Sequence, residues 1–155
     1  MTQPKATRPY MPGYGIARDE AGLLPWSYVE ERMGAARNYW LITAAENRPH
    51  AAPVWGVWHK RNFYFSSGTS SRKGRNLAAN PSVTLHLESG DEVVILEGQI
   101  ETVAEPDLLQ ELDQAYQQKY QVSILGGQVY TLRVEQAFAW REQDFPRTAT
   151  RWTLR

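Results

Sequence analysis

The stretch that decides the fold runs from residue 62 to residue 81 and reads Asn62-Phe-Tyr-Phe-Ser-Ser-Gly-Thr-Ser-Ser-Arg-Lys-Gly-Arg-Asn-Leu-Ala-Ala-Asn-Pro81. Its aromatic start is typical of a strand, and the turn rich in serine, glycine and threonine leads directly into a short helix. The first helical turn carries Arg72, Lys73 and Arg75, although unpaired N–H groups already make a helix start positive. A broken local preference of this kind indicates a functional site. We therefore expect a bound anion there, a phosphate held by N–H groups, hydroxyls and cations.

The composition excludes several classes of function. The 155 residues fit one domain, and 17 basic and 17 acidic residues leave no net charge, which argues against a nucleic-acid partner. The chain has no cysteine, which excludes disulfides, thiolate catalysis and cysteine metal sites. The three histidines lack metal-ligand spacing, so we expect no metal. No apolar run reaches transmembrane length and no signal segment is visible, so we expect a cytoplasmic protein without a membrane partner.

The chain divides into an N-terminal arm and one domain. Residues 1–24 are rich in proline and glycine and are predicted to be irregular, either disordered or laid across a partner. Residues 25–155 form the single predicted domain, which Pro25 opens as the first residue of a helix.

Short strands with hairpin turns dominate this domain. Helices are expected from Pro25, over 72–79 and over 106–120. Strands are expected over 39–43, 50–58, 63–67, 83–87, 93–103, 129–134, 137–140 and 151–154, with a bulge at Gly98. This pattern predicts a mainly β protein, an antiparallel sheet or barrel with a few helices.

The chemistry of a self-sufficient enzyme is missing from the sequence. There is no Gly-x-Ser-x-Gly elbow, no Walker A loop, and no carboxylate pair placed for acid–base work. A phosphate cradle without a protein-borne catalytic set indicates either a protein that only binds or one whose cofactor does the chemistry.

Residues 48–103 resemble the flavin-binding split-barrel proteins related to pyridoxamine 5′-phosphate oxidase. The matching segments are Arg48-Pro-His-Ala-Ala-Pro-Val-Trp55, Phe63-Tyr-Phe-Ser-Ser67, Ser71-Arg-Lys-Gly-Arg-Asn-Leu77, Asn80-Pro-Ser-Val83 and Val94-Ile-Leu-Glu-Gly98. The resemblance implies a six-stranded antiparallel split β-barrel of the FMN-binding type, which forms a homodimer with two cofactor sites at its interface. It also implies FMN or the deazaflavin F420 as the cofactor.

Carried over onto this chain, the resemblance implies a set of cofactor-binding residues. Arg72 and Lys73 would hold the cofactor phosphate. Ser66 and Ser67 would add hydroxyl and backbone contacts to it. The residues implied to line the isoalloxazine ring are Pro53, Val54 and Trp55, with Trp140 completing the site from this or the partner chain.

Structural interpretations stand beside these roles. Arg72 and Lys73 could be solvated cations, although the helix polarity and the motif together favour phosphate binding. Ser66 and Ser67 could be no more than a strand end, and packing in the core or an interface is an equal alternative for Trp55.

The expected function is that of an FMN- or F420-dependent oxidoreductase that transfers hydride to or from a small organic substrate. The alternative is a non-catalytic protein that stores or senses such a cofactor. The oxidase itself has an arginine-rich C-terminal motif without a clear equivalent here, so a general oxidoreductase of the family is expected. No catalytic residue can be named from the sequence.

Overall fold

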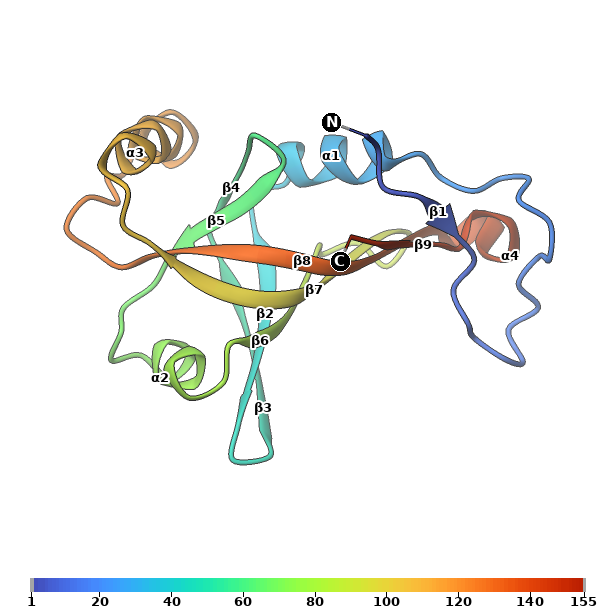
Figure 1. The fold of residues 1–155 in the computed structure, drawn as a ribbon, viewed down its shortest axis with the longest axis horizontal. Helices are drawn as coiled ribbons and strands as arrows, with labels where there is room; N and C mark the ends of the chain where they lie inside the picture. Colours follow the sequence, from blue (N-terminus) through green and yellow to red (C-terminus); the bar gives the residue numbers. More distant parts are fainter. Residues whose placement is uncertain (1, 155) are drawn as a thin grey trace.

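The computed structural model describes residues 2–154 and contains a nine-stranded antiparallel sheet with four α-helices around it (Figure 1). The strands run in the order β1-β9-β8-β7-β6-β2-β3, and β5 pairs with both β4 and β8. The strands are β1 (Ala6–Thr7), β2 (Tyr39–Ala45), β3 (Arg48–Val54), β4 (Val57–His59), β5 (Asn62–Ser66), β6 (Ser82–His86), β7 (Glu92–Val103), β8 (Val129–Arg141) and β9 (Thr150–Thr153). The helices are α1 (Trp26–Ala35), α2 (Arg72–Ala79), α3 (Pro106–Tyr120) and α4 (Phe145–Thr148).

The core lies on one face of the strongly bent sheet because side chains alternate between its faces. Leu41, Leu85, Leu96 and Ala137 lie in register across β2, β6, β7 and β8, and each is at most 1% exposed. Burying such side chains stabilises the fold by about 1.5–3 kcal/mol each for the leucines. The predicted mainly β, antiparallel class is confirmed.

Two helices complete the packing. The helix expected from Pro25 is α1, which begins at Trp26 with Pro25 as its N-cap. Trp26 is buried and packs edge-on against Trp152 of β9, with 5.4 Å between ring centroids. Helix α3 has the predicted bounds, and its Leu112, Tyr116 and Tyr120 form a second, smaller cluster with residues of β4, β5 and β8.

Two predicted strands differ from the structure. The strand expected over 50–58 is broken after Val54, because Gly56 lies so close to the Phe63 ring that a side chain there would overlap it. The two strands expected over 129–140 are one strand, β8, which pairs along the whole of β7. The register of that pair shifts between Glu97 and Gly98, which confirms the predicted bulge.

The N-terminal arm is laid along the chain's own C-terminal elements (Figure 1). Its strand β1 pairs with β9, and the guanidinium of Arg8 donates to the carbonyl oxygens of Asp19, Ala21, Arg147 and Ala149. The prediction of a wholly irregular arm was therefore wrong at Ala6–Thr7. Residues 1 and 155, the outer ends of the predicted arm and domain, lie outside the described residues.

Candidate functional site

The start of α2 has two backbone N–H groups without an acceptor. Ser71 caps the helix, since its Oγ accepts from the Gly74 N–H at 3.1 Å while the Arg75 N–H donates to the Ser71 carbonyl at 2.9 Å. For the N–H groups of Arg72 and Lys73 no protein acceptor occurs within residues 2–154. Two N–H groups that point out of a helix start are a site for an anionic oxygen.

Gly74 holds this helix start against the loop before it. A Cβ at this position would overlap the carbonyl oxygen of Gly68 and lie 2.9 Å from the Cα of Thr69. Only a residue without a side chain allows the helix to approach the loop so closely. The serine- and threonine-rich loop is thereby kept beside the free N–H groups.

The rest of α2 is fastened to the sheet by two asparagines. The Asn76 side chain donates to the Thr43 hydroxyl at 3.0 Å inside the protein, and the Asn80 side chain donates to the Ala44 carbonyl at 3.1 Å. Buried hydrogen bonds of this kind fix the orientation of the helix, because breaking one leaves an unpaired polar group. Asn76 and Asn80 thus anchor the helix to β2.

The predicted serines line a hollow beside the helix start. This hollow has a volume of about 540 Å³ and is formed by residues 66–70 and 126–128. Ser66 Oγ donates to the Gln128 carbonyl at 2.8 Å, and Ser67 Oγ lies 3.4 Å from Ser71 Oγ. Ser67 therefore links the end of β5 to the cap of α2.

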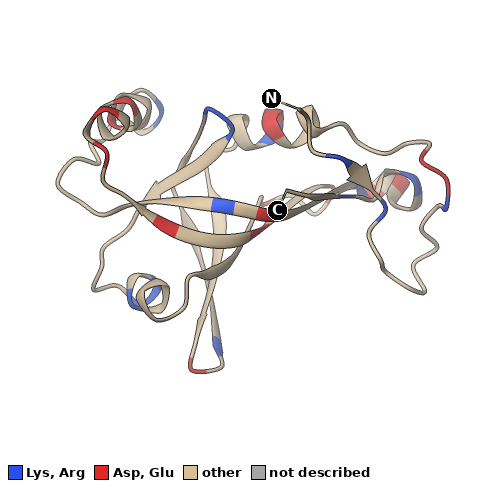
Figure 2. Cartoon of the chain, in the orientation of Figure 1, with Lys and Arg blue, Asp and Glu red and all other residues tan. Residues whose placement is uncertain are grey.

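The cations of α2 have no carboxylate partner. Among the ion pairs formed by residues 2–154, none involves Arg72, Lys73 or Arg75. Figure 2 shows their positive charge on α2 without an acidic residue on the same helix. The Arg75 guanidinium donates instead to the Ser70 carbonyl oxygen at 2.7 Å. Arg72 lines a separate hollow, between α2 and the β2–β3 hairpin.

The three residues expected to line a flavin ring differ in exposure. Pro53 is exposed at the end of β3, whereas Val54 is buried. Trp55 is 41% exposed, and its ring stacks on that of Tyr120 with centroids 4.7 Å apart and an interplanar angle of 7°. Trp55 is therefore both packed on one face and accessible.

A tyrosine of α3 connects Trp55 with Ser66 at the end of β5. The Tyr116 hydroxyl donates to the Trp55 carbonyl at 2.8 Å and accepts from the Ser66 N–H at 3.3 Å. The spacing of Tyr116 with Leu112 and Tyr120 is that of a buried helix stripe, which by itself indicates only a packing residue. The sequence offers one signal for the connecting role of Tyr116, because the hydroxyl of a buried tyrosine needs a hydrogen-bond partner.

Lys119 forms a second connection that the sequence did not reveal. Its Nζ donates to the Tyr39 hydroxyl and to the Gly56 carbonyl, each at 2.9 Å. Burial, and then repulsion from Arg37, lowers the pKa of Lys119 to about 8. Burial also raises the pKa of the Tyr39 hydroxyl. This pair holds the Trp55–Gly56 turn against α3.

Trp140 lies away from the other predicted residues within one protomer. Ser66 pairs with Val129 at one end of β8, and Trp140 pairs with Val93 near the other end. Trp140 follows Val129 by eleven positions along β8, which corresponds to roughly 36 Å of strand. Trp140 packs on Phe145 instead, with 5.4 Å between ring centroids.

The described residues 2–154 contain no group of His, Cys, Asp and Glu side chains that could hold a metal ion. None of the helices in this part of the chain is long and apolar enough to cross a membrane.

The sequence and the fold both have relatives. The family model described as pyridoxamine 5′-phosphate oxidase matches residues 29–146. No curated protein matches the chain. Among solved structures, a conserved hypothetical protein from Mycobacterium tuberculosis is similar with a TM-score of 0.68 at 19% identity, over 85% of this chain and 90% of that one. The FAD binding protein from Mycobacterium smegmatis has a TM-score of 0.56 at 16% identity, over 86% and 100% of the two chains. A protein named F420 reductase has a TM-score of 0.55 at 20% identity, over 68% and 91%.

Proposed function

Because the chain belongs to the pyridoxamine 5′-phosphate oxidase family and has its split-barrel fold, we propose that it is an oxidoreductase dependent on FMN or the deazaflavin F420. Its substrate is a small organic molecule that gains or loses a hydride. Proteins of the same fold named for FAD and for F420 support a flavin-type cofactor.

One observation carries this proposal: within residues 2–154 the N–H groups of Arg72 and Lys73 have no acceptor, and both side chains have no carboxylate partner. A phosphate would accept from both N–H groups and pair with both cations, and it would offset the positive end of the helix. Ser66 and Ser67 line the adjacent hollow, and the Ser66 hydroxyl, which here donates to the Gln128 carbonyl, would turn toward a bound phosphate. The residues present therefore fit the phosphate of a flavin-type cofactor.

The end of β3 and the turn after it would hold the ring system. Pro53 and the backbone of Val54 border the outer surface, and Trp55 is braced from behind by Tyr120. When bound, the cofactor supplies hydride transfer at its ring. The chain positions that ring through Trp55 and keeps water from one side of it. Tyr116 keeps the ring wall and the phosphate cradle at a constant separation.

We further propose that the protein acts as a homodimer with the cofactor sites at its interface. Trp40, His86, Ile95 and Phe138 lie in register across the outer face of the sheet and are half-buried in the single chain. Two such faces packed together would bury apolar surface that one chain leaves partly wet. Because Trp140 lies far from Ser66 on the same chain, it would reach the cofactor from the second chain of the dimer.

Cofactor binding tests the proposal directly. The absorbance spectrum and mass of the ligand that co-purifies, followed by titration of the empty protein with FMN and with F420, identify the cofactor. A hundredfold excess over Kd should stabilise the protein by about 2.7 kcal/mol. The double variant Arg72→Ala/Lys73→Ala should bind at least about a hundredfold more weakly, since each charge-assisted hydrogen bond contributes about 1.5–3 kcal/mol.

The control removes two exposed cations from the N-terminal arm, Lys5→Ala/Arg18→Ala, and should bind as the wild type does. Equal binding by the two double variants would falsify the phosphate site. Binding without turnover of any hydride donor or acceptor favours the alternative function, a storage or sensing protein.

A further inference from the structure

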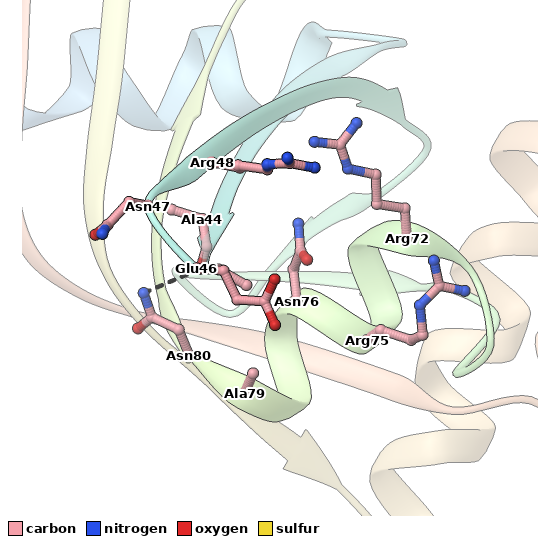
Figure 3. A pocket seen from close by; sticks show the side chains of 10 residues that line it. Ala44, Glu46, Asn47, Arg48, Arg72, Arg75, Asn76, Ala79 and Asn80 are labelled. Carbon is pink, nitrogen blue, oxygen red and sulfur yellow. Dashed lines mark hydrogen bonds between the residues drawn. The ribbon is translucent and has the colours of Figure 1, made fainter.

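A large hollow among the described residues lies outside the proposed phosphate cradle. It has a volume of about 660 Å³ and opens between the tip of the β2–β3 hairpin and the outer face of α2 (Figure 3). The polar and charged residues that line it are Glu46, Asn47, Arg48, Arg72, Arg75, Asn76 and Asn80. Neither the phosphate nor the ring of the proposed cofactor accounts for Arg48 or for the size of this space.

Three arginines from two elements line this hollow. Arg48 extends from β3 toward Arg72 of α2 (Figure 3). Arg75 follows one helical turn later, and its guanidinium donates to the Ser70 carbonyl at 2.7 Å. Glu46 is the one acidic residue among the lining residues, and within residues 2–154 it forms no ion pair with any of the three arginines. The lining thus has two more positive than negative charges, and guanidinium groups that face one another repel.

The two elements that carry the arginines are tied together. The hairpin turns at Glu46 and Asn47, whose φ values of 53° and 61° are those of a tight two-residue turn, and Ala45 pairs with Arg48 directly after it. The Asn80 side chain ties the far end of α2 to Ala44 of the same hairpin. The two walls of the hollow therefore keep a constant separation, which favours binding because little order has to be gained.

We propose that this hollow is a second anion subsite, which binds a carboxylate or phosphate group remote from the phosphate at the start of α2. Arg48 and Arg75 bind that group, and Arg72 lies between the two anions. Arginine suits this role, since its planar guanidinium can donate two parallel hydrogen bonds to one carboxylate or phosphate. The assignment of both anions to ligands of one active site rests on the proposed function. The second anion belongs either to an acidic tail of the cofactor or to an acidic substrate.

Direct titration with simple anions tests the subsite without any cofactor. The full chain is titrated with inorganic pyrophosphate and with citrate at low salt, and the side-chain N–H signals of the arginines are followed by nuclear magnetic resonance. We expect the signals of Arg48 and Arg75 to shift with saturation. Arg48→Ala/Arg75→Ala should bind citrate about ten- to a hundredfold more weakly, whereas Lys5→Ala/Arg18→Ala, with the same change in charge, should bind as the wild type does.

Cofactor titrations distinguish the two sources. If the tail of the cofactor fills the hollow, the Arg48/Arg75 double variant loses affinity for F420, whose tail is acidic, but keeps its affinity for FMN. If a substrate fills it, the Arg48/Arg75 double variant keeps its affinity for both cofactors. The cofactor-loaded wild type then still binds citrate, and the cofactor-loaded variant binds it more weakly. Arg48→Ala by itself should show part of each loss, and it leaves the fold intact because its side chain is exposed and forms no ion pair within residues 2–154.

The subsite is overturned if neither anion shifts the Arg48 and Arg75 signals, or if the Arg48/Arg75 variant binds citrate as tightly as the control variant does. Failure of the proposed function has a different signature, in which neither FMN nor F420 binds the wild type while citrate still shifts the Arg48 signal.

Discussion

Removing one hydroxyl, in Tyr116→Phe, should weaken both the fold and the cofactor site. The hydroxyl donates to the Trp55 carbonyl at 2.8 Å and accepts from the Ser66 N–H at 3.3 Å, and Tyr116 is 3% exposed. Phenylalanine keeps the ring packing but leaves one donor and one acceptor without their partner. Since a lost hydrogen bond costs about 1 kcal/mol and an unpaired buried group about 1–3 kcal/mol, we expect a loss of about 2 kcal/mol in the free energy of unfolding.

Urea unfolding monitored by tryptophan fluorescence measures that loss, which corresponds to a fall of roughly 4–8 °C in Tm for a chain of this size. Cofactor affinity should fall as well, because Trp55 and Ser66 are no longer held at one distance from each other. Tyr130→Phe is the matched control, since the Tyr130 ring is 6% exposed but its hydroxyl has no hydrogen-bond partner within residues 2–154. If Tyr116→Phe and Tyr130→Phe are equally stable and bind the cofactor equally well, Tyr116 is only a packing residue and the bridge has no role.

Three further perturbations follow from the structure. Between pH 8 and about 9.5 the unfolded chain binds more protons at Lys119 than the folded chain, because burial lowers the pKa of Lys119 to about 8. The free energy of unfolding should therefore rise with pH in that window. Urea unfolding at several pH values measures this rise, and Lys119→Met should not show it. Gly74→Ala should cost about 1–3 kcal/mol and loosen phosphate binding, because its methyl group overlaps the loop before α2, whereas Gly34→Ala, in open space, should leave thermal unfolding unchanged or raise its midpoint. Arg8→Ala should free the N-terminal arm and speed its cleavage in limited proteolysis, while the exposed Arg18→Ala should not; equal cleavage would show that the four carbonyl contacts of Arg8 do not hold the arm.

Much of the fold could be predicted because its signals are local. Alternation of apolar and polar residues marked the strands, proline and glycine marked the turns, and Pro106–Tyr120 had the spacing of a helix with one buried face. The proximity of Ser66 and Ser67 to the start of α2 could be predicted for the same reason, since these residues and Arg72 lie within one strand–turn–helix segment, while the binding of a phosphate there stays a prediction. The break at Gly56 could not, because it depends on the Phe63 ring, which reaches that backbone only when β4 and β5 pair.

The sequence by itself determined the antiparallel β class and the short helix with a cationic start at 72–79, both of which depend on neighbouring residues. Only the tertiary structure decided which distant groups complete the site. It placed the Tyr116 hydroxyl between Trp55 and Ser66, 61 and 50 residues away along the chain, and it brought Arg48 of the hairpin toward Arg72. Periodicity tells which face of an element is buried but not which side chain of another element that face will meet. That choice depends on the closure and register of the whole sheet.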